Sequence, residues 1–335
     1  MISTIKPADT FRIIPGFFMD KIRPDVLIQY MNNDTTDLPT AVIYVRPKTN
    51  LVKYEKEILV GLQPYADVIY LANLNGKLFI KNALILEHYS TQYKFSIMGK
   101  EEVKKYSEMK KKIEKFFDRD FDSMKIIGAF DAMLEMNLTA DALFNIIVEK
   151  KDFLKLYGQT IKKVKDYYIV NYNIPAILEK YTPTANIFVV AVRLKDKNTS
   201  LKLLDQSIFE NIQNDKNTPI IDEDKLGKLK WNEKIRRTYH ISRNHIIAMF
   251  DMMDFVFKSN GDHIKLEEIP FAKWLFDRGN INEQQLLQLK DYAIVYIRKN
   301  RKKKLVNILE ESMHKNFEEC EELLKSIIWE DRIKE

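Results

Sequence analysis

The chain has 335 residues, of which 45% are hydrophobic and 30% charged, and its formal net charge is +6. A content of 11% aromatic residues excludes a disordered chain. The longest apolar run is far shorter than the roughly 20 residues of a membrane-spanning helix. The length exceeds what one hydrophobic core usually organises, so we expect two domains. The first residues include no apolar signal segment, and the single cysteine, Cys320, has no partner for an internal disulfide. These features predict a cytoplasmic protein without a membrane partner.

The nine glycines exclude several nucleotide-binding and hydrolytic designs. The closest two, Gly61 and Gly76, are 15 residues apart, so no two glycines share one loop. Dinucleotide-binding and P-loop motifs need glycines within about five residues of each other, because the backbone must approach the phosphates. The nucleophile elbow of serine hydrolases also needs two close glycines. We therefore expect no cofactor, assign no catalytic residue and favour a non-catalytic protein.

The first part of the chain alternates β-rich and helical segments. Strands are predicted at 41–46, 67–72, 93–98, 125–130, 167–170 and 187–194. Between them, apolar residues recur every three or four positions over 51–62, 103–117 and 133–147, which predicts helices. This alternation predicts an α/β domain over residues 1–215, with a parallel or mixed sheet and flanking helices. The dipeptide Asn75-Gly76 between two apolar runs predicts a tight hairpin, which favours a mixed sheet.

The ends of these strands include side chains that suit a small anionic ligand. Open α/β sheets bind ligands beyond the carboxyl ends of their strands, and the candidate ligand-binding residues there are Arg46, Lys48, Asn73 and Asn171. The two cations suit a phosphate or a carboxylate, and the two asparagines suit a sugar or an amide. One alternative function is therefore an enzyme acting on a small phosphorylated or carboxylated metabolite at the sheet edge. The other interpretation of these positions is ordinary turn geometry, which favours asparagine and proline.

Beyond a polar linker at 211–224, residues 216–335 are predicted to form a mainly helical domain. Its tail from Leu305 has an apolar stripe formed by Leu309, Met313, Phe317, Cys320, Leu324, Ile327 and Ile328. This pattern predicts a C-terminal amphipathic helix that packs on the chain's own core. The alternative is self-association through residues 305–328 into a homo-oligomer, which would make the protein a structural or assembly scaffold.

The stretch 236-RRTYHISRNHII-247 predicts a helix-turn-helix. Its interior positions are occupied by Ile235, Tyr239, Ile241, Ile246 and Met249. Ser242 falls at the N-cap of the second helix, where its hydroxyl can accept a bond from a backbone N–H. Arg243 and Asn244 begin the exposed face, and both are side-chain types that read base edges through paired hydrogen bonds. The motif requires the chain to bend sharply at His240 and Ile241.

A short basic hairpin is predicted after this helix. Asn260-Gly261 suits a two-residue turn. The turn pairs Phe257 with Ile264 and Phe255 with Leu266, and places Lys258, His263 and Lys265 on the opposite face. Residues 232–266 therefore resemble the winged helix-turn-helix of bacterial transcription regulators, a motif that we place within 225–266. The sequence departs from that pattern at Arg236, where a small residue is usual, and at His240, where glycine is usual. The alternative is one amphipathic helix over 231–257 with a solvated basic face.

Local charge favours a nucleic-acid partner. Residues 225–247 contain seven lysines and arginines against one glutamate, and 298-RKNRKKK-304, at the predicted start of the last helix, places six cations in seven residues. Such concentrations suit phosphate contacts. The favoured function is a non-catalytic nucleic-acid-binding protein, such as a DNA-binding regulator, whose N-terminal domain senses a ligand or mediates assembly. The predicted nucleic-acid-binding residues are Arg237, Ser242, Arg243, Asn244, Lys258, Lys265, Arg301 and Lys302.

The histidine spacing predicts no metal site. His240 and His245 are five residues apart, so on one helix their rings would point about 140 degrees from each other. A zinc site would also need two more ligands. The other candidates, Cys320 and His263, lie at no recognisable spacing from this pair.

Overall fold

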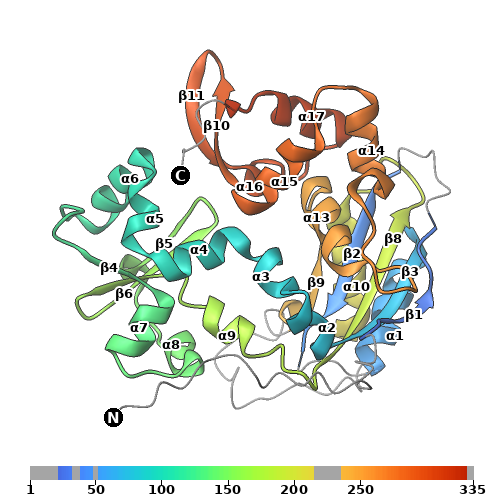
Figure 1. Cartoon of the computed structure of the whole chain (residues 1–335), viewed down its shortest axis with the longest axis horizontal. Coiled ribbons are helices and arrows are strands. Elements are labelled where there is room, and N and C mark those ends of the chain that lie inside the picture. Colours follow the sequence, from blue (N-terminus) through green and yellow to red (C-terminus); the bar gives the residue numbers. More distant parts are fainter. Residues whose placement is uncertain (1–21, 32–37, 48–51, 215–234, 330–335) are drawn as a thin grey trace, which may run out of the picture.

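The computed structural model describes residues 22–31, 38–47, 52–214 and 235–329 (Figure 1). Within these ranges it contains 15 α-helices and 11 strands, so the mixed α and β composition expected from the sequence is confirmed. The strands form a five-stranded sheet, a four-stranded sheet and a two-stranded hairpin. No helix in the described ranges is both long enough and apolar enough to cross a membrane.

The larger sheet is antiparallel throughout and has the strand order β1-β3-β8-β2-β9. In that order its strands are Asp25–Ile28, Ala66–Asn75, Asn186–Leu194, Thr40–Val45 and Tyr239–Ile241. The strands predicted at 41–46, 67–72 and 187–194 are thus confirmed as β2, β3 and β8. The predicted parallel or mixed pairing is wrong for this sheet, which has no parallel pair among the described strands. Its neighbours β3 and β8 are separated in sequence by the whole second sheet and not by one crossover helix. β9 lies beyond residue 215, so the sheet includes residues from both sides of the predicted domain boundary.

Both faces of the larger sheet are covered, which explains why its central strands are continuous apolar runs. Every residue of β2 is buried. Ile43 and Val45 belong to the core cluster that includes helices α1 (Val52–Leu62) and α10 (Leu201–Asn214). Val42 and Tyr44 belong to the opposite core, which includes α13 (His245–Phe255). The helix predicted at 51–62 is confirmed as α1.

The smaller sheet has the order β4-β7-β6-β5, and only its β4 and β7 pair in parallel. In that order its strands are Lys125–Gly128, Tyr167–Val170, Gln159–Val164 and Phe153–Leu156. The strand predicted at 167–170 is thus confirmed, and the strand predicted at 125–130 is confirmed as far as Gly128, because Ala129 begins α7. Helices α2 (Gly76–Lys81) and α3 (Leu84–His88) contribute to the core of the larger sheet that includes α13. The other helices of this part of the chain are α4 (Ser90–Met98), α5 (Lys100–Lys104), α6 (Ser107–Phe117), α7 (Ala129–Glu135), α8 (Ala140–Asn145) and α9 (Ile174–Leu178), with a 3₁₀ turn at Lys150–Asp152.

Two local predictions in this region are wrong. The segment predicted as a strand at 93–98 is the end of α4, where Phe95 is buried while Ile97 and Met98 are exposed. Its apolar residues at every second position imitate a strand by coincidence. Asn75-Gly76 forms no hairpin, because the Asn75 side chain caps α2 by accepting a bond from the Leu78 N–H at 3.0 Å. Gly76 is needed for close packing: a Cβ there would lie 1.7 Å from the Thr182 carbonyl oxygen.

The last part of the chain contains several short helices and one β-hairpin, and no single long helix at its described end. Its elements after α13 are α14 (Pro270–Asp277), α15 (Glu283–Asp291), β10 (Ile294–Lys299), β11 (Lys302–Asn307), α16 (Ile308–Glu311) and α17 (Phe317–Lys325), with a 3₁₀ turn at Leu266–Glu268. The predicted continuous helix from Leu305 is wrong, since the Asn307 and Asn316 side chains cap two separate helices. Phe317, Cys320 and Leu324 are buried in the core that also includes α13, so the predicted apolar stripe packs within the chain.

The basic run 298–304 forms the hairpin β10–β11 and not a helix start. Asn300 and Arg301 occupy its turn with φ values of 51° and 60°. Two successive left-handed residues are typical of the two-residue turns that join twisted antiparallel strands. The hairpin stands at the edge of the molecule in Figure 1.

Candidate functional site

The geometry of a helix-turn-helix is not found at 236–247. Residues 239–241 form β9 and pair with β2, with Tyr44 opposite His240. The N-cap of α13 is Asn244, whose side chain accepts a bond from the Ile247 N–H at 2.8 Å. The predicted helix through Tyr239 and the predicted N-cap at Ser242 are therefore wrong. The reason is tertiary, because the edge of β2 supplies backbone partners that make a strand the better conformation for this segment.

Of the three predicted nucleic-acid-binding residues at 242–244, two are enclosed by the protein itself. Ser242 is fully buried and accepts a bond from the Val42 N–H at 2.9 Å. The side-chain amide of Asn244, which is 2% exposed, donates to the Leu309 carbonyl at 2.8 Å. Arg243 is exposed, in the loop between β9 and α13. Of the three, only Arg243 is available to a partner in this structure.

The predicted basic hairpin is a turn whose apolar side is buried and whose cations face carboxylates. Its turn is where the sequence predicts, but Phe257 lies opposite His263 and not Ile264, because the loop has three residues and not two. Lys258 pairs with Glu268 at 2.8 Å and Lys265 with Glu267 at 3.4 Å. The remaining predicted contacts, Arg237, Arg301 and Lys302, are exposed.

The four predicted ligand-binding residues do not meet at one site. Lys48 lies outside the described residues. Asn73 lies inside β3, opposite Asp25 and Phe188. Asn171 is buried beside the smaller sheet, where its amide donates to Gln159 at 2.7 Å. Arg46, directly after β2, lines a pocket.

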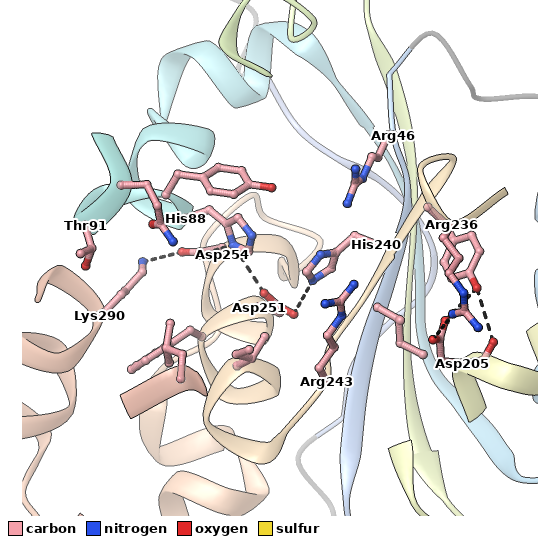
Figure 2. Close-up of a pocket in the computed structure, with 17 residues that line it drawn as sticks. Arg46, His88, Thr91, Asp205, Arg236, His240, Arg243, Asp251, Asp254 and Lys290 are labelled. Carbon is pink, nitrogen blue, oxygen red and sulfur yellow. Dashed lines mark hydrogen bonds and ion pairs between the residues drawn. The ribbon is translucent and has the colours of Figure 1, made fainter. Parts of the chain in front are cut away.

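This pocket lies between the β2–β9 edge of the larger sheet and helices α3, α13 and α15, and it encloses about 330 Å³ (Figure 2). Its charged residues are the four cations Arg46, Arg236, Arg243 and Lys290 and the three carboxylates Asp205, Asp251 and Asp254. Two histidines, His88 and His240, stand among them. The pocket therefore combines an excess of cationic side chains with titratable groups.

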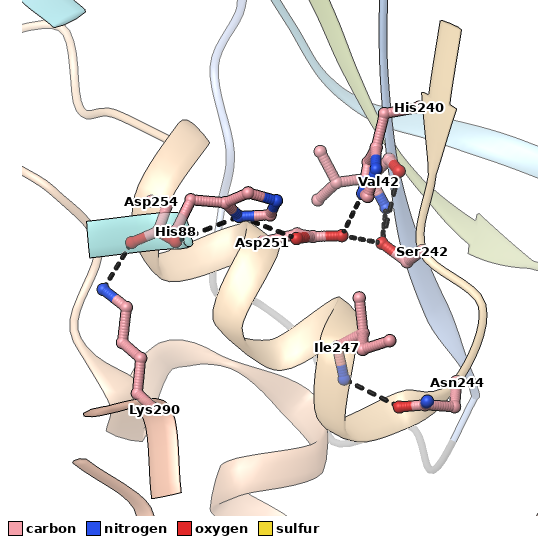
Figure 3. Close-up of polar contacts among 9 residues, drawn as sticks. All are labelled: Val42, His88, His240, Ser242, Asn244, Ile247, Asp251, Asp254 and Lys290. Atoms are coloured by element: carbon pink, nitrogen blue, oxygen red, sulfur yellow. Dashed lines mark hydrogen bonds and ion pairs between the residues drawn. The ribbon is translucent and has the colours of Figure 1, made fainter. Parts of the chain in front are cut away.

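A chain of polar contacts runs along the base of the pocket (Figure 3). Lys290 Nζ pairs with Asp254 Oδ1, and Asp254 Oδ2 lies 3.4 Å from His88 Nδ1. The same nitrogen of His88 lies 3.4 Å from Asp251 Oδ1. Asp251 Oδ2 lies 2.8 Å from His240 Nε2 and accepts a bond from the Ser242 hydroxyl at 2.6 Å. Six side chains from four separate elements and one loop are thus connected.

Helix α13 supplies both acids of this chain. Asp251 and Asp254 are three residues apart, so they lie on the same helix face. Asp251 is fully buried and Asp254 is 3% exposed. Among the described residues, Asp251 Oδ1 and Asp254 Oδ2 have no hydrogen-bond partner. Burial of a carboxylate is strongly unfavourable unless it is paired, so this arrangement needs a compensating positive charge.

His240 is held by its neighbours in one orientation. The Tyr44 ring stacks on it with centroids 4.6 Å apart, and the His88 ring meets it edge-on. Burial lowers the pKa of the His240 imidazole, although Asp251 acts in the opposite direction. The net effect favours the neutral ring. Burial alone would raise the pKa of the Asp251 carboxyl, but its contacts with His240, His88 and Ser242 lower it, so this group is a carboxylate.

Arginines flank His240 in the pocket. The guanidinium groups of Arg46 and Arg243 point toward His240 from opposite sides in Figure 2. Arg236 has a different position, because it pairs with Asp205 and stacks on Phe209 with 4.6 Å between the guanidinium carbon and the ring centre. Arg236 therefore stabilises the wall of the pocket, whereas Arg46 and Arg243 approach its centre.

Four residues of this site were not predicted from the sequence: His88, Asp251, Asp254 and Lys290. His88 is 152 residues from His240 in the chain, so no spacing indicates that they meet. One signal was present: the two aspartates interrupt the otherwise apolar helix 245-HIIAMFDMMDF-255. Acidic residues on a buried helix are rare unless paired, and this alone indicates a cationic partner.

Comparison with known protein families, with curated proteins and with solved structures gave no match.

Proposed function

We propose that the protein is an enzyme that acts on a small phosphorylated or carboxylated metabolite bound in the pocket between Arg46 and Arg243. The observation that carries this proposal is the approach of two guanidinium groups to His240 within a pocket of about 330 Å³. Ligand pockets of proteins usually enclose about 300–1,000 Å³, so this one suits a compact ligand.

The charge of the pocket supports an anionic ligand. Its four cations exceed its three carboxylates. A guanidinium group binds phosphate and carboxylate through two parallel hydrogen bonds, which fixes the orientation of the ligand. Arg46 and Arg243 are the side chains that we expect to hold it.

The titratable groups favour an enzyme over a sensor that only binds. His240 and Asp251 both have shifted pKa values and both line the cavity. Groups with shifted pKa values gather at catalytic sites, because proton transfer near neutral pH requires such tuning. An imidazole oriented by a buried carboxylate is a common arrangement for that purpose.

Thermal-shift and calorimetric titrations with inorganic phosphate, phosphorylated sugars and small dicarboxylates test this proposal. We expect a subset of these compounds to stabilise the wild-type protein, and Arg243→Ala to weaken their binding by about tenfold or more, since a charged hydrogen bond contributes about 1.5–3 kcal/mol. Arg237→Ala is the matched control, because Arg237 is also exposed but does not line the pocket. Failure of all these anions to bind, or equal binding by both variants, would contradict the proposal.

Nucleic-acid binding is a second candidate, favoured by the exposed cations of the β10–β11 hairpin. Residues 298–304 are all exposed, and Arg301 and Lys302 occupy the turn and the strand start. Lys299 and Lys304 pair with Glu311, which leaves less charge for phosphates than the sequence alone suggests. Fluorescence anisotropy with labelled single-stranded and duplex DNA and RNA at low salt tests this candidate. Binding that persists in Arg301→Glu/Lys302→Glu, or that is absent from the wild-type protein, would exclude the hairpin as a nucleic-acid surface.

A further inference from the structure

Three side chains from distant parts of the chain offer metal-ligand atoms to one point. His88 ends α3, His240 lies on β9 and Asp251 lies on α13. One potential ligand atom from each residue lies within 4.8 Å of the other two. Imidazole nitrogens and a carboxylate oxygen are the usual ligands of zinc and related ions.

The separation of His88 from Asp251 agrees with a single shared ion. Two ligand atoms bound to one zinc ion at about 2.1 Å, with a tetrahedral angle between them, lie about 3.4 Å apart. His88 Nδ1 and Asp251 Oδ1 are separated by 3.4 Å. His240 Nε2 lies 2.8 Å from Asp251 Oδ2, which is a hydrogen-bond distance. Binding of Nε2 to an ion replaces this hydrogen bond and requires the tautomer with its proton on Nδ1.

The second and independent observation is an unsatisfied buried oxygen. Asp251 is fully buried, and its Oδ1 has no hydrogen-bond partner among the described residues. Buried carboxylate oxygens without a partner are rare in folded proteins and indicate a missing ion or water. This oxygen is the one that lies beside His88 Nδ1, which is where the distances place the ion.

The surroundings of these residues also suit a cation. The Ser242 hydroxyl donates to Asp251 Oδ2 at 2.6 Å, which fixes the carboxylate in the way that outer partners of metal ligands do. Asp254, whose Oδ2 also lacks a hydrogen bond among the described residues, lies 3.4 Å from His88. Among the described residues, Lys290 is the one lysine that pairs with these two buried carboxylates. A divalent cation would balance the remaining negative charge.

We propose that His88 Nδ1, His240 Nε2 and Asp251 Oδ1 bind one divalent transition-metal ion, with zinc as the first choice, at the base of the pocket. Two nitrogens and one oxygen favour a first-row transition metal over magnesium or calcium, which prefer oxygen ligands alone. Three protein ligands leave the fourth position open, as in catalytic zinc sites.

The open position connects the ion to the rest of the pocket. Arg46 and Arg243 would oppose a bare cation beside His240, but they attract an anion bound to that cation. The ion and the two arginines would therefore hold one anionic ligand between them. The metal site itself does not depend on the proposed anion, because metal uptake is measured without it.

Metal titration of tag-free protein tests this proposal directly. Protein stripped with a chelator and dialysed is titrated with Zn²⁺ against a chromogenic competitor, and the bound metal is counted by elemental analysis. We expect one tightly bound ion per chain. Loss of an outer partner of a metal ligand typically weakens affinity by about 10–100-fold, so loss of a ligand itself, in His88→Gln or Asp251→Asn, should weaken it by more than about 100-fold.

His314→Asn is the matched control, because His314 is exposed and asparagine tolerates its left-handed backbone, φ 65°. This variant should bind zinc as the wild-type protein does. If Asp251→Asn does not fold, as judged by circular dichroism, His88→Gln and the visible absorption of Co²⁺-loaded wild-type protein provide the answer. Tetrahedral nitrogen and oxygen coordination gives intense Co²⁺ bands, and hexaaquo Co²⁺ gives weak ones.

Two results would overturn the metal proposal: no retained ion in the wild-type protein, or undiminished zinc affinity in His88→Gln. Both results differ from the one that would overturn the anion proposal. If only the anion proposal fails, zinc binds normally, while phosphate and carboxylate ligands bind neither the zinc-loaded nor the zinc-free protein.

Discussion

The buried imidazole of His245 should make the stability of the fold depend on pH. His245 is the first residue of α13, is 8% exposed, and lies against the rings of Phe271 and Phe317 with centroid distances of 5.9 and 4.7 Å. Its Nδ1 has no hydrogen-bond partner among the described residues. Burial in these apolar surroundings lowers the pKa of the imidazole from 6.5 to about 4.

The sign of the effect follows from which state binds the proton. Between pH 6.5 and about pH 4 the unfolded chain is protonated at His245 while the folded protein is not, so the free energy of unfolding falls as the pH falls. Each unit of pKa difference corresponds to about 1.36 kcal/mol. Stability should therefore decrease by about 2 kcal/mol between pH 7 and pH 5 and by about 3 kcal/mol between pH 7 and pH 4 from this group alone.

Urea unfolding at several pH values, in the wild-type protein and in His245→Leu, measures this contribution. Leucine has a similar volume and no titratable group. The free energy of unfolding of the wild-type protein, minus that of His245→Leu, should therefore fall by about 2 kcal/mol from pH 7 to pH 5. His314→Asn should keep the wild-type slope, because His314 is exposed. Parallel pH dependence in the wild-type protein and His245→Leu would refute the assignment of a neutral, buried imidazole.

Three further predictions concern local packing and reactivity. Gly76→Ala should destabilise the protein by about 3 kcal/mol, because the new Cβ would lie 1.7 Å from the Thr182 carbonyl oxygen. Gly279→Ala, with no atom within 4 Å of its new Cβ, should lose only the smaller backbone term of about 1 kcal/mol, and equal losses in urea titrations would contradict the packing argument. Asn244→Ala should destabilise the protein by about 1 kcal/mol or more through loss of the α13 cap and of the bond to the Leu309 carbonyl, and unchanged stability would show that the cap is dispensable. Cys320 is fully buried, and burial raises the pKa of its thiol to about 12, so it should react with a thiol reagent only after unfolding; rapid reaction in native buffer would exclude this burial.

Strong local patterns in the sequence were sufficient for the long buried elements. The runs at 41–46, 67–72 and 187–194 became β2, β3 and β8, and the apolar spacing over 51–62 became α1. These segments are long enough to show the apolar pattern of a helix or a strand, and that pattern does not depend on which partner covers them. Arg46 was also chosen correctly as a residue at a strand end, and it lines the pocket.

Short segments depended on partners far away in the chain. The three residues of β9 are a strand because the edge of β2, about 200 residues earlier, offers hydrogen bonds to them. Considered alone, the twelve residues 236–247, which include β9, fitted the pattern of two helices and a turn. No local signal separates these alternatives, because three residues are too few to show a period.

The candidate site shows the same division. The sequence by itself determined that the protein contains both helices and strands, that it has abundant cations and that it has no glycine-rich phosphate loop. It also contained the two acids of α13, whose positions on an apolar helix required a buried partner. Only the tertiary structure decided that their partners include His88 and Lys290, and that His240 faces Asp251 and not His245. The physical reason is that the contact between α3, β9 and α13 depends on how the sheet and helices pack, and packing joins residues without regard to their separation in the chain.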